Sequence, residues 1–524
     1  MERAGIRVCV LGLGTTGLAV ARYFCGLPPL GAPAAAAPAP APAASAAAAS
    51  AAAASAAAAL NPAPAAPAAA RVASLTIYAG AETPAARAAI DSMIASTQGW
   101  LRPADIIFEE QEVTGEFDLA VISPGIAPTS SLFESARACA TELIGEPELA
   151  WRISPERWIG ITGTNGKTTT TCLLGHVLVQ CGIPALVAGN IGLPCIDAIQ
   201  LRQPGEYLVA ELSSFQLASA FKLKPDAAIL LNITPDHLGW HGGFESYVRD
   251  KRRIFYHMDP EAPAVIDATM DTTRELVLQR RQRDKRVIPL GTADGLSGDM
   301  TIRCGAEEAA FVDAATGRLT VILQGQRHEL LKADELQIKG EHNQENALAA
   351  AAVALALGAE APQVCAALAS FQPLEHRIEP AGTVDGVEFF NDSKATNPEA
   401  TLKALSAFTG RPLILLLGGR DKNTPLDELV AAAVPACKAV ICYGEAGGRF
   451  AEAFLLAHDR SVLLVPGFQQ AFDTAVEMAE PGDVVLLSPA CASFDEFGSF
   501  EQRGAAFKGL VCQLQAQQPA EGVQ

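Results

Sequence analysis

Short runs of Val, Ile and Leu alternate with longer stretches of helical pattern along most of the chain. The runs have the length of buried strands, and a further strand is expected near Ser74 to Tyr78. Continuous apolar strands separated by helices are typical of parallel sheets covered on both faces. The pattern therefore predicts an α/β fold. The runs are IRVCVLG, DLAVISPG, RWIGITG, YLVAEL, DAAILLNI, PLILLLGG and DVVLLSP.

Two breaks in this pattern divide the 524 residues into three expected domains, in line with about 100–200 residues per domain. The first lies near Gly145, before the strand that leads to GTNGKTTT. The second lies near Pro373, after a helical stretch from Asn343 to about Ser370. The expected domains are residues 1–145, 146–373 and 374–524.

A tract of Ala, Pro and Ser interrupts the first domain at about residues 27–71. It has little apolar area to bury against the entropy of ordering, so it is interpreted as a disordered insertion. Its proline-free part, Ala43 to Asn61, is long enough only for a transient Ala-rich helix. The insertion follows the first strand and helix, after Phe24.

The charge and cysteine content restrict the class of partner and the compartment. The chain has 39 basic and 58 acidic side chains, a formal charge of -19, which argues against nucleic acid or an anionic membrane as a partner. The sequence has no run of about 20 strongly apolar residues, so no membrane span is predicted. The 12 cysteines form no C-x-x-C pair, which favours reduced thiols and a cytoplasmic location.

The strongest local motif is WIGITGTNGKTTTT, from Trp158 to Thr171. Gly163 and Gly166 let backbone N–H groups approach phosphate oxygens, Lys167 supplies a positive charge, and Thr168 can reach Mg²⁺. The motif departs from the usual phosphate loop because Ile161 stands at its first glycine. An ordinary strand-to-helix turn that contains a lysine is the alternative reading.

Three residues at later strand ends could complete a magnesium site beside a triphosphate. They are Glu211 in AELSSFQL, His237 in NITPDHLGWHG and Lys251 in RDKRRIF. Magnesium binds hard oxygen ligands. Taken alone, His237 would be a structural histidine and Lys251 a solvated surface charge.

The first strand ends in a second glycine motif, Gly12-Leu13-Gly14-Thr15-Thr16-Gly17. Alone it would indicate a dinucleotide cofactor and an NAD-dependent oxidoreductase. That alternative leaves GTNGKTTT unexplained.

Seven motifs together carry a family resemblance that covers nearly the whole chain apart from the insertion. GTNGKTT, ELSSFQL, NITPDHL, GEHNQENALAA, EHRIE, NDSKATNP and LLGGRDK stand in the order found in Mur ligases, which the chain resembles. The block SPACASFDEFGSFEQRG resembles the members that add D-glutamate. Another Mur ligase and a folylpolyglutamate synthase, which shares the G-T-x-G-K-T loop, are the nearest alternatives. A non-catalytic nucleotide-binding regulator is disfavoured by Lys167, Glu211 and Lys251.

The resemblance implies a fold and an activity. The expected fold has a Rossmann-like N-terminal domain, a central P-loop ATPase-like domain with a parallel sheet, and a Rossmann-like C-terminal domain. The implied enzyme is a monomeric ligase that uses ATP and Mg²⁺ to join D-glutamate to UDP-N-acetylmuramoyl-L-alanine through an acyl phosphate, in peptidoglycan precursor synthesis. Lys251 is expected to be carbamylated and to bind Mg²⁺ with Thr168, Glu211 and His237.

The resemblance also assigns binding residues. Taken singly, Asn346 would be a helix cap, Arg377 a surface ion pair and Phe500 a core residue. The segment around Glu82 and Thr83 does not reproduce the family's uracil-binding pattern, so these two are only candidates. The residues assigned to ATP are Gly163, Thr164, Asn165, Gly166, Lys167, Thr168, Thr169, Asn346, Arg377, Asp392 and Lys394. Those assigned to the UDP-substrate are Gly14, Thr15, Thr16, Gly17, Ser123, Pro124, Gly125 and Asn190, and those assigned to D-glutamate are Thr396, Lys422, Ser493 and Phe500.

Overall fold

The chain forms two compact units, and a short segment of the second unit, residues 337–343, interrupts the first unit along the sequence. The first unit is Met1–Leu336 with Gln344–Phe371, and the second is Gln337–Asn343 with Gln372–Gln524. Residues 30–71 of the expected insertion, which include its helix at 43–61, and Lys422 lie outside the described residues. The computed structural model describes residues 5–29, 72–97, 99–284, 286–291, 308–421, 424–457 and 461–517.

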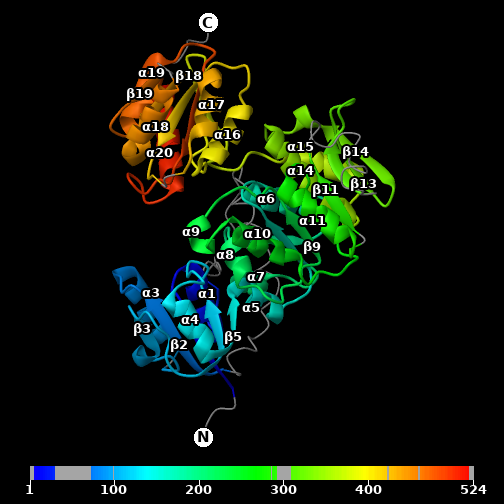
Figure 1. Cartoon of the computed structure of the whole chain (residues 1–524), viewed down its shortest axis with the longest axis vertical. Coiled ribbons are helices and arrows are strands. Elements are labelled where there is room, and N and C mark those ends of the chain that lie inside the picture. Colours follow the sequence, from blue (N-terminus) through cyan, green and yellow to red (C-terminus); the bar gives the residue numbers. More distant parts are fainter. Residues whose placement is uncertain are drawn as a thin grey trace. The chain divides into compact units, whose positions relative to one another are not determined.

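The first unit begins with a five-stranded parallel sheet in the order β3-β2-β1-β4-β5, which is the Rossmann order without its sixth strand (Figure 1). Side chains of β1 alternate between two apolar clusters, Val8 and Val10 in one and Cys9 and Leu11 in the other. Both faces of the sheet are therefore covered. The elements are β1 (Ile6–Leu11), α1 (Thr15–Phe24), β2 (Val72–Gly80), α3 (Pro84–Ser96), β3 (Ile106–Phe108), β4 (Phe117–Ile122), α4 (Ser131–Cys139) and β5 (Ala140–Gly145).

Helix α5 (Glu146–Ile153) follows this sheet and packs against the next one through two buried carboxylates. Glu148 accepts hydrogen bonds from the backbone N–H groups of Phe221 and Lys222. Glu146 accepts one from the N–H of Ile196 at 2.5 Å. Because both carboxylates bind backbone groups of the following segment, the two sheets of the first unit are joined by specific contacts as well as by the chain.

The second sheet has nine strands in the order β14-β13-β12-β11-β10-β9-β6-β8-β7. Pairing is parallel from β7 to β12 and antiparallel between β12, β13 and β14. Its strands are β6 (Trp158–Thr162), β7 (Ala185–Gly189), β8 (Tyr207–Glu211), β9 (Ala227–Leu230), β10 (Ala264–Asp267), β11 (Val287–Leu290), β12 (Ala309–Val312), β13 (Arg318–Leu323) and β14 (Gln326–Lys332). Its helices are α6 (Lys167–Gln180), α7 (Cys195–Leu201), α8 (Ser214–Ala218), α9 (Leu238–His241), α10 (Phe244–Arg252) and α11 (Asp271–Arg281).

The helical stretch expected from Asn343 to about Ser370 consists of two helices, α14 (Glu341–Ala356) and α15 (Ala361–Ser370). Gly358 separates them with a φ of +95°, a left-handed conformation that glycine adopts at low cost. All alanines of α14 except the last, Ala356, are fully buried. The second helix packs against α6 and so supports the segment that carries the glycine-lysine motif.

The second unit holds a six-stranded sheet in the order β15-β16-β20-β17-β18-β19. Only β15 is antiparallel to its neighbour. The strands are β15 (Glu379–Val384), β16 (Val387–Asn391), β17 (Leu413–Gly418), β18 (Cys437–Tyr443), β19 (Val462–Leu464) and β20 (Val484–Ala490). The helices are α16 (Pro398–Ser406), α17 (Asp427–Ala436), α18 (Gly444–Leu456), α19 (Phe468–Met478) and α20 (Phe500–Gln517).

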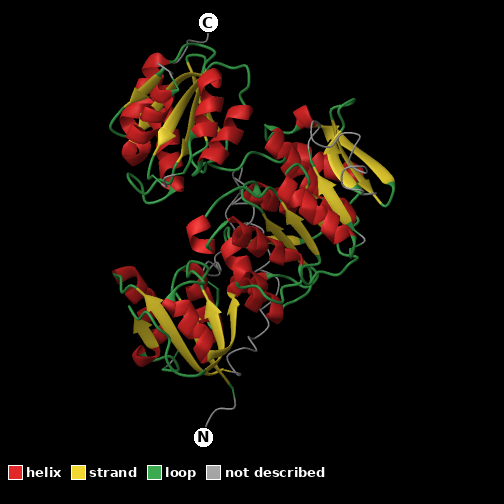
Figure 2. Ribbon diagram, viewed as in Figure 1, coloured by secondary structure: helices red, strands yellow, loops and turns green. Residues whose placement is uncertain are grey.

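Strand β17 shows why this sheet is covered on both faces. Leu415 and Leu417 pack into the cluster lined by α16, α17 and α18, whereas Ile414 and Leu416 pack against α19 and α20. Figure 2 shows helices on both sides of these strands. The α/β fold class with parallel sheets is thus confirmed. In the described part of the chain, no helix has the length and hydropathy needed to cross a membrane.

Burial of Glu146 predicts a pH-dependent loss of stability. The side chain is 1% exposed, and burial, followed by the N–H of Ile196 acting in the opposite sense and by Asp197, leaves the pKa of Glu146 at about 8. Between the ordinary pKa and about 8, the folded protein keeps a proton that the unfolded chain loses, so stability falls as pH rises through this window. Glu146→Gln keeps an acceptor for Ile196 and removes the charge. We expect the variant to be more stable than the native protein. The expected gain in the free energy of unfolding is about 1.4 kcal/mol for each unit by which the pKa of Glu146 is raised.

Thermal unfolding at about pH 5 and about pH 8 measures this gain. The control is Glu142→Gln, because the Arg152 guanidinium and then Lys222 lower the pKa of Glu142 to about 2. Loss of that charge is expected to destabilise the protein slightly at neutral pH, since the Glu142 side chain is 41% exposed. A melting difference between Glu146→Gln and native protein that is equal at both pH values contradicts the prediction.

Candidate active site

The loop between β6 and α6 is shaped by two glycines that have no room for a side chain. Gly163 has a φ of +156°, and an added Cβ would lie 2.7 Å from Cβ of Leu231. Gly166 has a φ of +86°, and its Cβ would lie 2.5 Å from Oδ1 of Asn346. This Asn346 oxygen also accepts a hydrogen bond from Oγ1 of Thr170 at 3.0 Å. The glycines thus bring the start of α14 against the loop.

The loop backbone is held by contacts from the neighbouring strand end. The N–H of Thr164 donates to the carbonyl of Asn232 at 2.7 Å, and the N–H of Asn165 donates to the Asn232 side chain at 2.9 Å. Oγ1 of Thr164 lies 2.9 Å from the hydroxyl of Tyr247. Lys167 Nζ donates to the Thr164 carbonyl at 2.7 Å, so the ammonium group lies across the loop. This is the geometry of a phosphate-binding turn at a helix N-terminus.

Two threonines follow Lys167 in the first turn of α6. Thr168 is partly buried, and Thr169 is 3% exposed. Thr168 is therefore the more accessible of the two for a metal or a phosphate. Asn165 remains partly exposed at the turn, with its side-chain nitrogen buried and without a hydrogen-bond partner among the described residues.

Glu211 and Lys251 are both buried beside this loop. Glu211 is 2% exposed at the end of β8, where Oε1 accepts a hydrogen bond from Asn190 at 3.0 Å. Within the described residues, its Oε2 is buried and has no hydrogen-bond partner. Lys251 on α10 is also 2% exposed, and its Nζ donates to the Gly163 carbonyl at 2.6 Å. The structure therefore bonds the expected lysine to the phosphate loop and places the expected carboxylate on the strand next to β6.

Burial of Lys251 and the charges around it determine the direction in which its pKa is shifted. Burial, and then the charge of Lys167, hold the pKa of Lys251 well below the ordinary range, while Asp236 and Glu211 act in the opposite sense. A lowered pKa favours the neutral, nucleophilic form of a lysine amine. Four ionisable groups thus interact at one point of the first unit: Lys167, Glu211, Asp236 and Lys251. Asp236, which the sequence analysis did not assign, is adjacent to His237 in NITPDHL.

His237 lies on the solvent side of this cluster. Its backbone has a φ of +52°, and its side chain is 46% exposed. The ring lies 4.8 Å from the ring of Phe215, and Nε2 lies 3.4 Å from a carboxylate oxygen of Asp236. These contacts give the histidine a fixed position near Asp236.

A buried network ties together the segments that carry Glu211, His237 and Lys251. Nδ1 of His241 lies 2.8 Å from the carboxylate of Asp250, and Nε2 lies 2.9 Å from Oγ of Ser214. These three residues come from α9, α10 and α8. This network could not be predicted from the sequence, because the spacing of Ser214 and Asp250 along the chain forms no recognisable motif.

The residues present fit a magnesium ion that is shared with a triphosphate. In the described ranges, no group of three or more His, Cys, Asp and Glu side chains is placed to hold a metal ion. Magnesium in nucleotide sites needs only one or two protein carboxylates, with phosphate oxygens and water completing its shell. The buried Oε2 of Glu211 and the hydroxyl of Thr168 supply donors of that kind.

The two turns expected to bind the UDP-substrate meet at one edge of the first sheet. An added Cβ on Gly17 would lie 1.9 Å from the Gly12 carbonyl, so α1 packs directly on the turn. Ser123, which follows β4, donates to the Gly12 carbonyl at 3.3 Å. Gly14 precedes the first turn of α1, which starts with Thr15 and Thr16, and Pro124 and Gly125 follow Ser123.

The remaining candidates for the UDP-substrate have other contacts. Asn190 directly follows β7 of the second sheet and donates to Glu211, so neither its position in the sequence nor its partner connects it to the glycine turn. Thr83 caps α3 by accepting from the N–H of Ala86 at 3.1 Å, and Glu82 pairs with Arg87. The side chains of Glu82 and Thr83 therefore have structural partners.

In the second unit, the nucleotide candidates Asp392 and Lys394 lie in the segment that directly follows β16. Asp392 is buried, accepts from Oγ of Ser488 at 2.7 Å and accepts from the N–H of Ile378 at 3.3 Å. Burial outweighs the Ser488 hydrogen bond and the charge of Arg377, and raises the pKa of Asp392 to about 7. Nζ of Lys394 lies 5.3 Å from the centre of the Phe500 ring.

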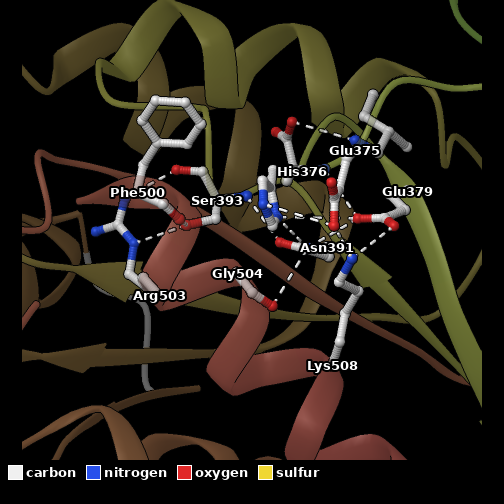
Figure 3. Close-up of polar contacts among 11 residues, drawn as sticks. Glu375, His376, Glu379, Asn391, Ser393, Phe500, Arg503, Gly504 and Lys508 are labelled. Atoms are coloured by element: carbon white, nitrogen blue, oxygen red, sulfur yellow. Dashed lines mark hydrogen bonds and ion pairs between the residues drawn. The ribbon is translucent and has the colours of Figure 1, made fainter. Parts of the chain in front are cut away.

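The D-glutamate candidates of the second unit lie at the carboxyl ends of its strands. Ser493 is 2% exposed, and its Oγ is buried without a hydrogen-bond partner among the described residues. Thr396 lies in the turn before α16, and Phe500 begins α20. Figure 3 shows Phe500 beside Ser393 and Arg503. Lys422 lies outside the described residues, so its position is not assigned.

Comparison with known families supports the combination of a phosphate loop and a C-terminal ligase domain. Residues 161–354 match the Mur ligase middle domain. Residues 376–491 match the Mur ligase, glutamate ligase domain. The two matches fall on the second sheet and on the C-terminal sheet.

Similar proteins extend along most of the chain. A UDP-N-acetylmuramoylalanine--D-glutamate ligase of Pelotomaculum thermopropionicum is 38% identical over 397 residues, 76% of this chain and 84% of that protein. The ligase of the same name from Thermoanaerobacter pseudethanolicus is 39% identical over 400 residues, again 76% of this chain and 84% of the relative.

Solved structures share the fold at low sequence identity. UDP-N-acetylmuramate-alanine ligase MurC from Thermotoga maritima aligns with a TM-score of 0.54 and 15% identity, over 98% of this chain and 100% of that one. MurF from Acinetobacter baumannii aligns with a TM-score of 0.55 and 18% identity, over 83% and 90%. These likenesses concern the fold alone.

Proposed function

The chain belongs to the Mur ligase family, and from this premise we propose that it joins D-glutamate to UDP-N-acetylmuramoyl-L-alanine with the hydrolysis of ATP. The observation that carries the proposal is the cluster at the glycine loop, where the partly exposed Lys167 lies near the buried Glu211 and Lys251. The D-glutamate specificity is supported by the two relatives and by the block SPACASFDEFGSFEQRG. We propose the cytoplasm as its location, which the free thiols of the described cysteines support.

The proposed reaction proceeds in two steps. A carboxylate is a poor electrophile, so one oxygen of the L-alanine carboxylate first attacks the γ-phosphorus of ATP, the bond to the β-phosphate oxygen breaks, and ADP leaves. The D-glutamate amine then attacks the carbonyl carbon of the acyl phosphate. The tetrahedral intermediate expels inorganic phosphate, the amine loses a proton, and an amide remains. Catalysis of such transfers rests mostly on positioning and charge neutralisation.

The chain's own residues have defined tasks in the first step. Backbone N–H groups of Gly163 to Gly166 and the N-terminus of α6 bind phosphate oxygens, and Lys167 neutralises charge on the γ-phosphoryl group. Thr168, Glu211 and carbamylated Lys251 would hold Mg²⁺, with His237 at the edge of this group. Bound there, the ion would neutralise charge that builds up on the phosphoryl oxygens.

The other binding assignments follow the same logic. Asn346 lies against the phosphate loop in the first unit and is proposed to contact the nucleotide. Arg377, Asp392 and Lys394 of the second unit are proposed to reach its ribose and phosphates. We propose the Gly14–Gly17 and Ser123–Gly125 turns for the diphosphate of the UDP-substrate.

The buried hydroxyl of Ser493 is proposed to hydrogen-bond a carboxylate of D-glutamate, and Thr396, Lys422 and Phe500 are the other residues proposed to bind this substrate. The lack of a hydrogen-bond partner for Ser493 Oγ in the described chain is the structural support for this pocket, because buried hydroxyl groups ordinarily have partners.

The experiment that tests the function measures phosphate release with UDP-N-acetylmuramoyl-L-alanine, ATP and a panel of L- and D-amino acids. We expect release with D-glutamate and at least about a hundredfold less with L-glutamate or with D-alanine. D-alanine lacks the second carboxylate, and the opposite configuration of L-glutamate misplaces its amine or one carboxylate, so either ligand leaves polar groups of the site unpaired. Equal release with L-lysine or with a D-alanyl dipeptide would assign the chain to another branch of the family. Turnover with a folate substrate would favour a folylpolyglutamate synthase.

A further inference from the structure

Arg503 is a fully buried arginine whose five N–H groups all have acceptors. The residue lies on the first turn of α20 and is 0% exposed. Its Nε donates to Oγ of Ser393 at 3.0 Å, and its Nη2 donates to the carbonyls of Ser393 at 2.9 Å and Cys491 at 3.0 Å. Its Nη1 donates to the carbonyls of Ala492 at 3.3 Å and Gly418 at 3.4 Å. A buried guanidinium group is tolerated only when its donors are satisfied in this way.

These acceptors belong to three segments that lie far apart in the sequence. Cys491 and Ala492 directly precede Ser493, the proposed D-glutamate ligand. Ser393 stands between the proposed nucleotide ligands Asp392 and Lys394. Gly418 ends β17 and begins the turn that leads to residue 422. One side chain therefore bonds to both kinds of proposed binding segment.

The backbone leaves no freedom at this junction. Gly419 has a φ of +127°, and an added Cβ would lie 2.3 Å from the Ala492 carbonyl and 2.9 Å from Nη1 of Arg503. The N–H of Arg420 also donates to the Ala492 carbonyl, at 2.7 Å. The turn after β17 and the segment before Ser493 are thus held together with Arg503 between them.

A second contact joins the same helix to the nucleotide segment. Oγ of Ser393 donates to the Phe500 carbonyl at 2.8 Å, while accepting from Arg503 (Figure 3). One turn further along α20, Gly504 packs on His376, and its carbonyl accepts from Asn391 at 3.4 Å. Helix α20 therefore also supports the loop that carries Arg377.

We propose that Arg503 is a positioning residue that joins the D-glutamate pocket to the nucleotide-facing segment at Asp392–Lys394, so that both substrates depend on it together. The inference rests on the proposed function and deepens it. Among the described residues, Arg503 donates only to Ser393, Gly418, Cys491 and Ala492, and these bonds fix where the neighbouring Ser493, Phe500 and Lys394 stand. Binding of D-glutamate and of ATP is therefore coupled through one buried side chain.

The test compares Arg503→Lys and Arg503→Met with the native protein in the phosphate-release assay. A lysine keeps the charge but cannot reach acceptors on three segments, because its donors sit on one nitrogen. Since a hydrogen bond to a charged group contributes about 1.5–3 kcal/mol, we expect KM for D-glutamate to rise at least about tenfold and KM for ATP about threefold or more. The KM for UDP-N-acetylmuramoyl-L-alanine is expected to stay within about twofold, since its proposed contacts belong to the first unit.

The matched control is Arg411→Lys. Arg411 pairs with Glu388 near the amino-terminal ends of the strands of the same sheet, whereas the proposed binding segments follow the carboxyl-terminal ends. Its variant is therefore expected to keep all three KM values. Thermal melting identifies any variant that fails to fold. If both Arg503 variants unfold, Ser393→Ala removes a single acceptor of Arg503 and is expected to raise the same two KM values by smaller factors.

Three results would overturn the inference. In the first, Arg503→Lys matches Arg411→Lys in every KM. In the second, only kcat falls, as it does when fewer molecules are folded. In the third, KM for D-glutamate rises alone. Native protein that releases no phosphate with D-glutamate contradicts the proposed function instead, and ATP affinity measured by fluorescence titration then decides the inference: Arg503→Lys must bind ATP more weakly than Arg411→Lys.

Discussion

Replacement of Lys251 by alanine is expected to lower phosphate release at least about a hundredfold, because the variant loses a group proposed to bind the catalytic metal. The native amine is buried, bonded to the Gly163 carbonyl, and has its pKa lowered well below the usual range by burial and by Lys167. A neutral amine attacks CO₂ at its carbon, and loss of a proton gives a carbamate. The product would be a carboxylate, which would supply oxygen ligands to Mg²⁺ together with Glu211.

The carbamate has consequences that a structural lysine would lack. Short-chain carboxylates such as acetate are expected to restore part of the activity of Lys251→Ala. Mass spectrometry under native conditions with bicarbonate is expected to find the added CO₂ on the native protein only. Lys224→Ala is the control, since Lys224 is half exposed and pairs with Asp259 at 3.0 Å. Full activity of Lys251→Ala refutes the assignment, and loss of activity without carboxylate rescue would favour a cationic role.

Gly166→Ala is expected to lower kcat/KM for ATP at least about a hundredfold, equivalent to about 3 kcal/mol. The residue has a φ of +86°, and its added Cβ would stand 2.5 Å from Oδ1 of Asn346 and 3.1 Å from Cδ1 of Leu231. The loop or α14 must shift to relieve this overlap. Either movement displaces N–H groups that are proposed to bind the triphosphate. Initial rates at varied ATP concentration measure the effect.

Gly182→Ala is a control with matched backbone strain. Gly182 follows the C-terminus of the same helix with a φ of +77°, and an added Cβ there meets no atom within 4 Å. Both variants carry the left-handed cost of about 1 kcal/mol, but only Gly166→Ala disturbs the loop. Similar kinetics for the two variants would contradict the role given to the loop.

The parts of the site that follow one another in the chain could be predicted from the sequence. The strand, glycines, lysine and threonine of Trp158–Thr171 form a continuous motif, and the structure builds them as β6, a turn and α6. The strands were predictable for the same reason, because buried parallel strands are continuous apolar runs. The break at Gly358 was not predicted, since alanine-rich sequence on both sides favours helix throughout.

Residues that act through long-range packing carried no such signal. Arg503 looks like a surface arginine in FEQRG, and only the folded chain shows five buried acceptors around it. Tyr247 and Asn232 hold the phosphate loop from segments about 70 to 80 residues away. Asn190 was assigned from the family to the UDP-substrate, and its observed partner is Glu211. Its substrate contact stays a prediction.

Because the first unit is interrupted by residues 337–343 of the second, only certain positions allow the chain to be divided into fragments that keep each unit whole. A fragment that stops at Leu336 loses α14 and α15, and with them Asn346, which lies against Gly166. A fragment that stops at Phe371 keeps every residue of the first unit. The partner fragment from Gln372 onward lacks residues 337–343, whose Gly340 packs near Ala407. For the same reason, one protease cut near Leu336 leaves α14 and α15 bound to the first unit by packing alone, so the cut chain is expected to separate only when that packing is lost.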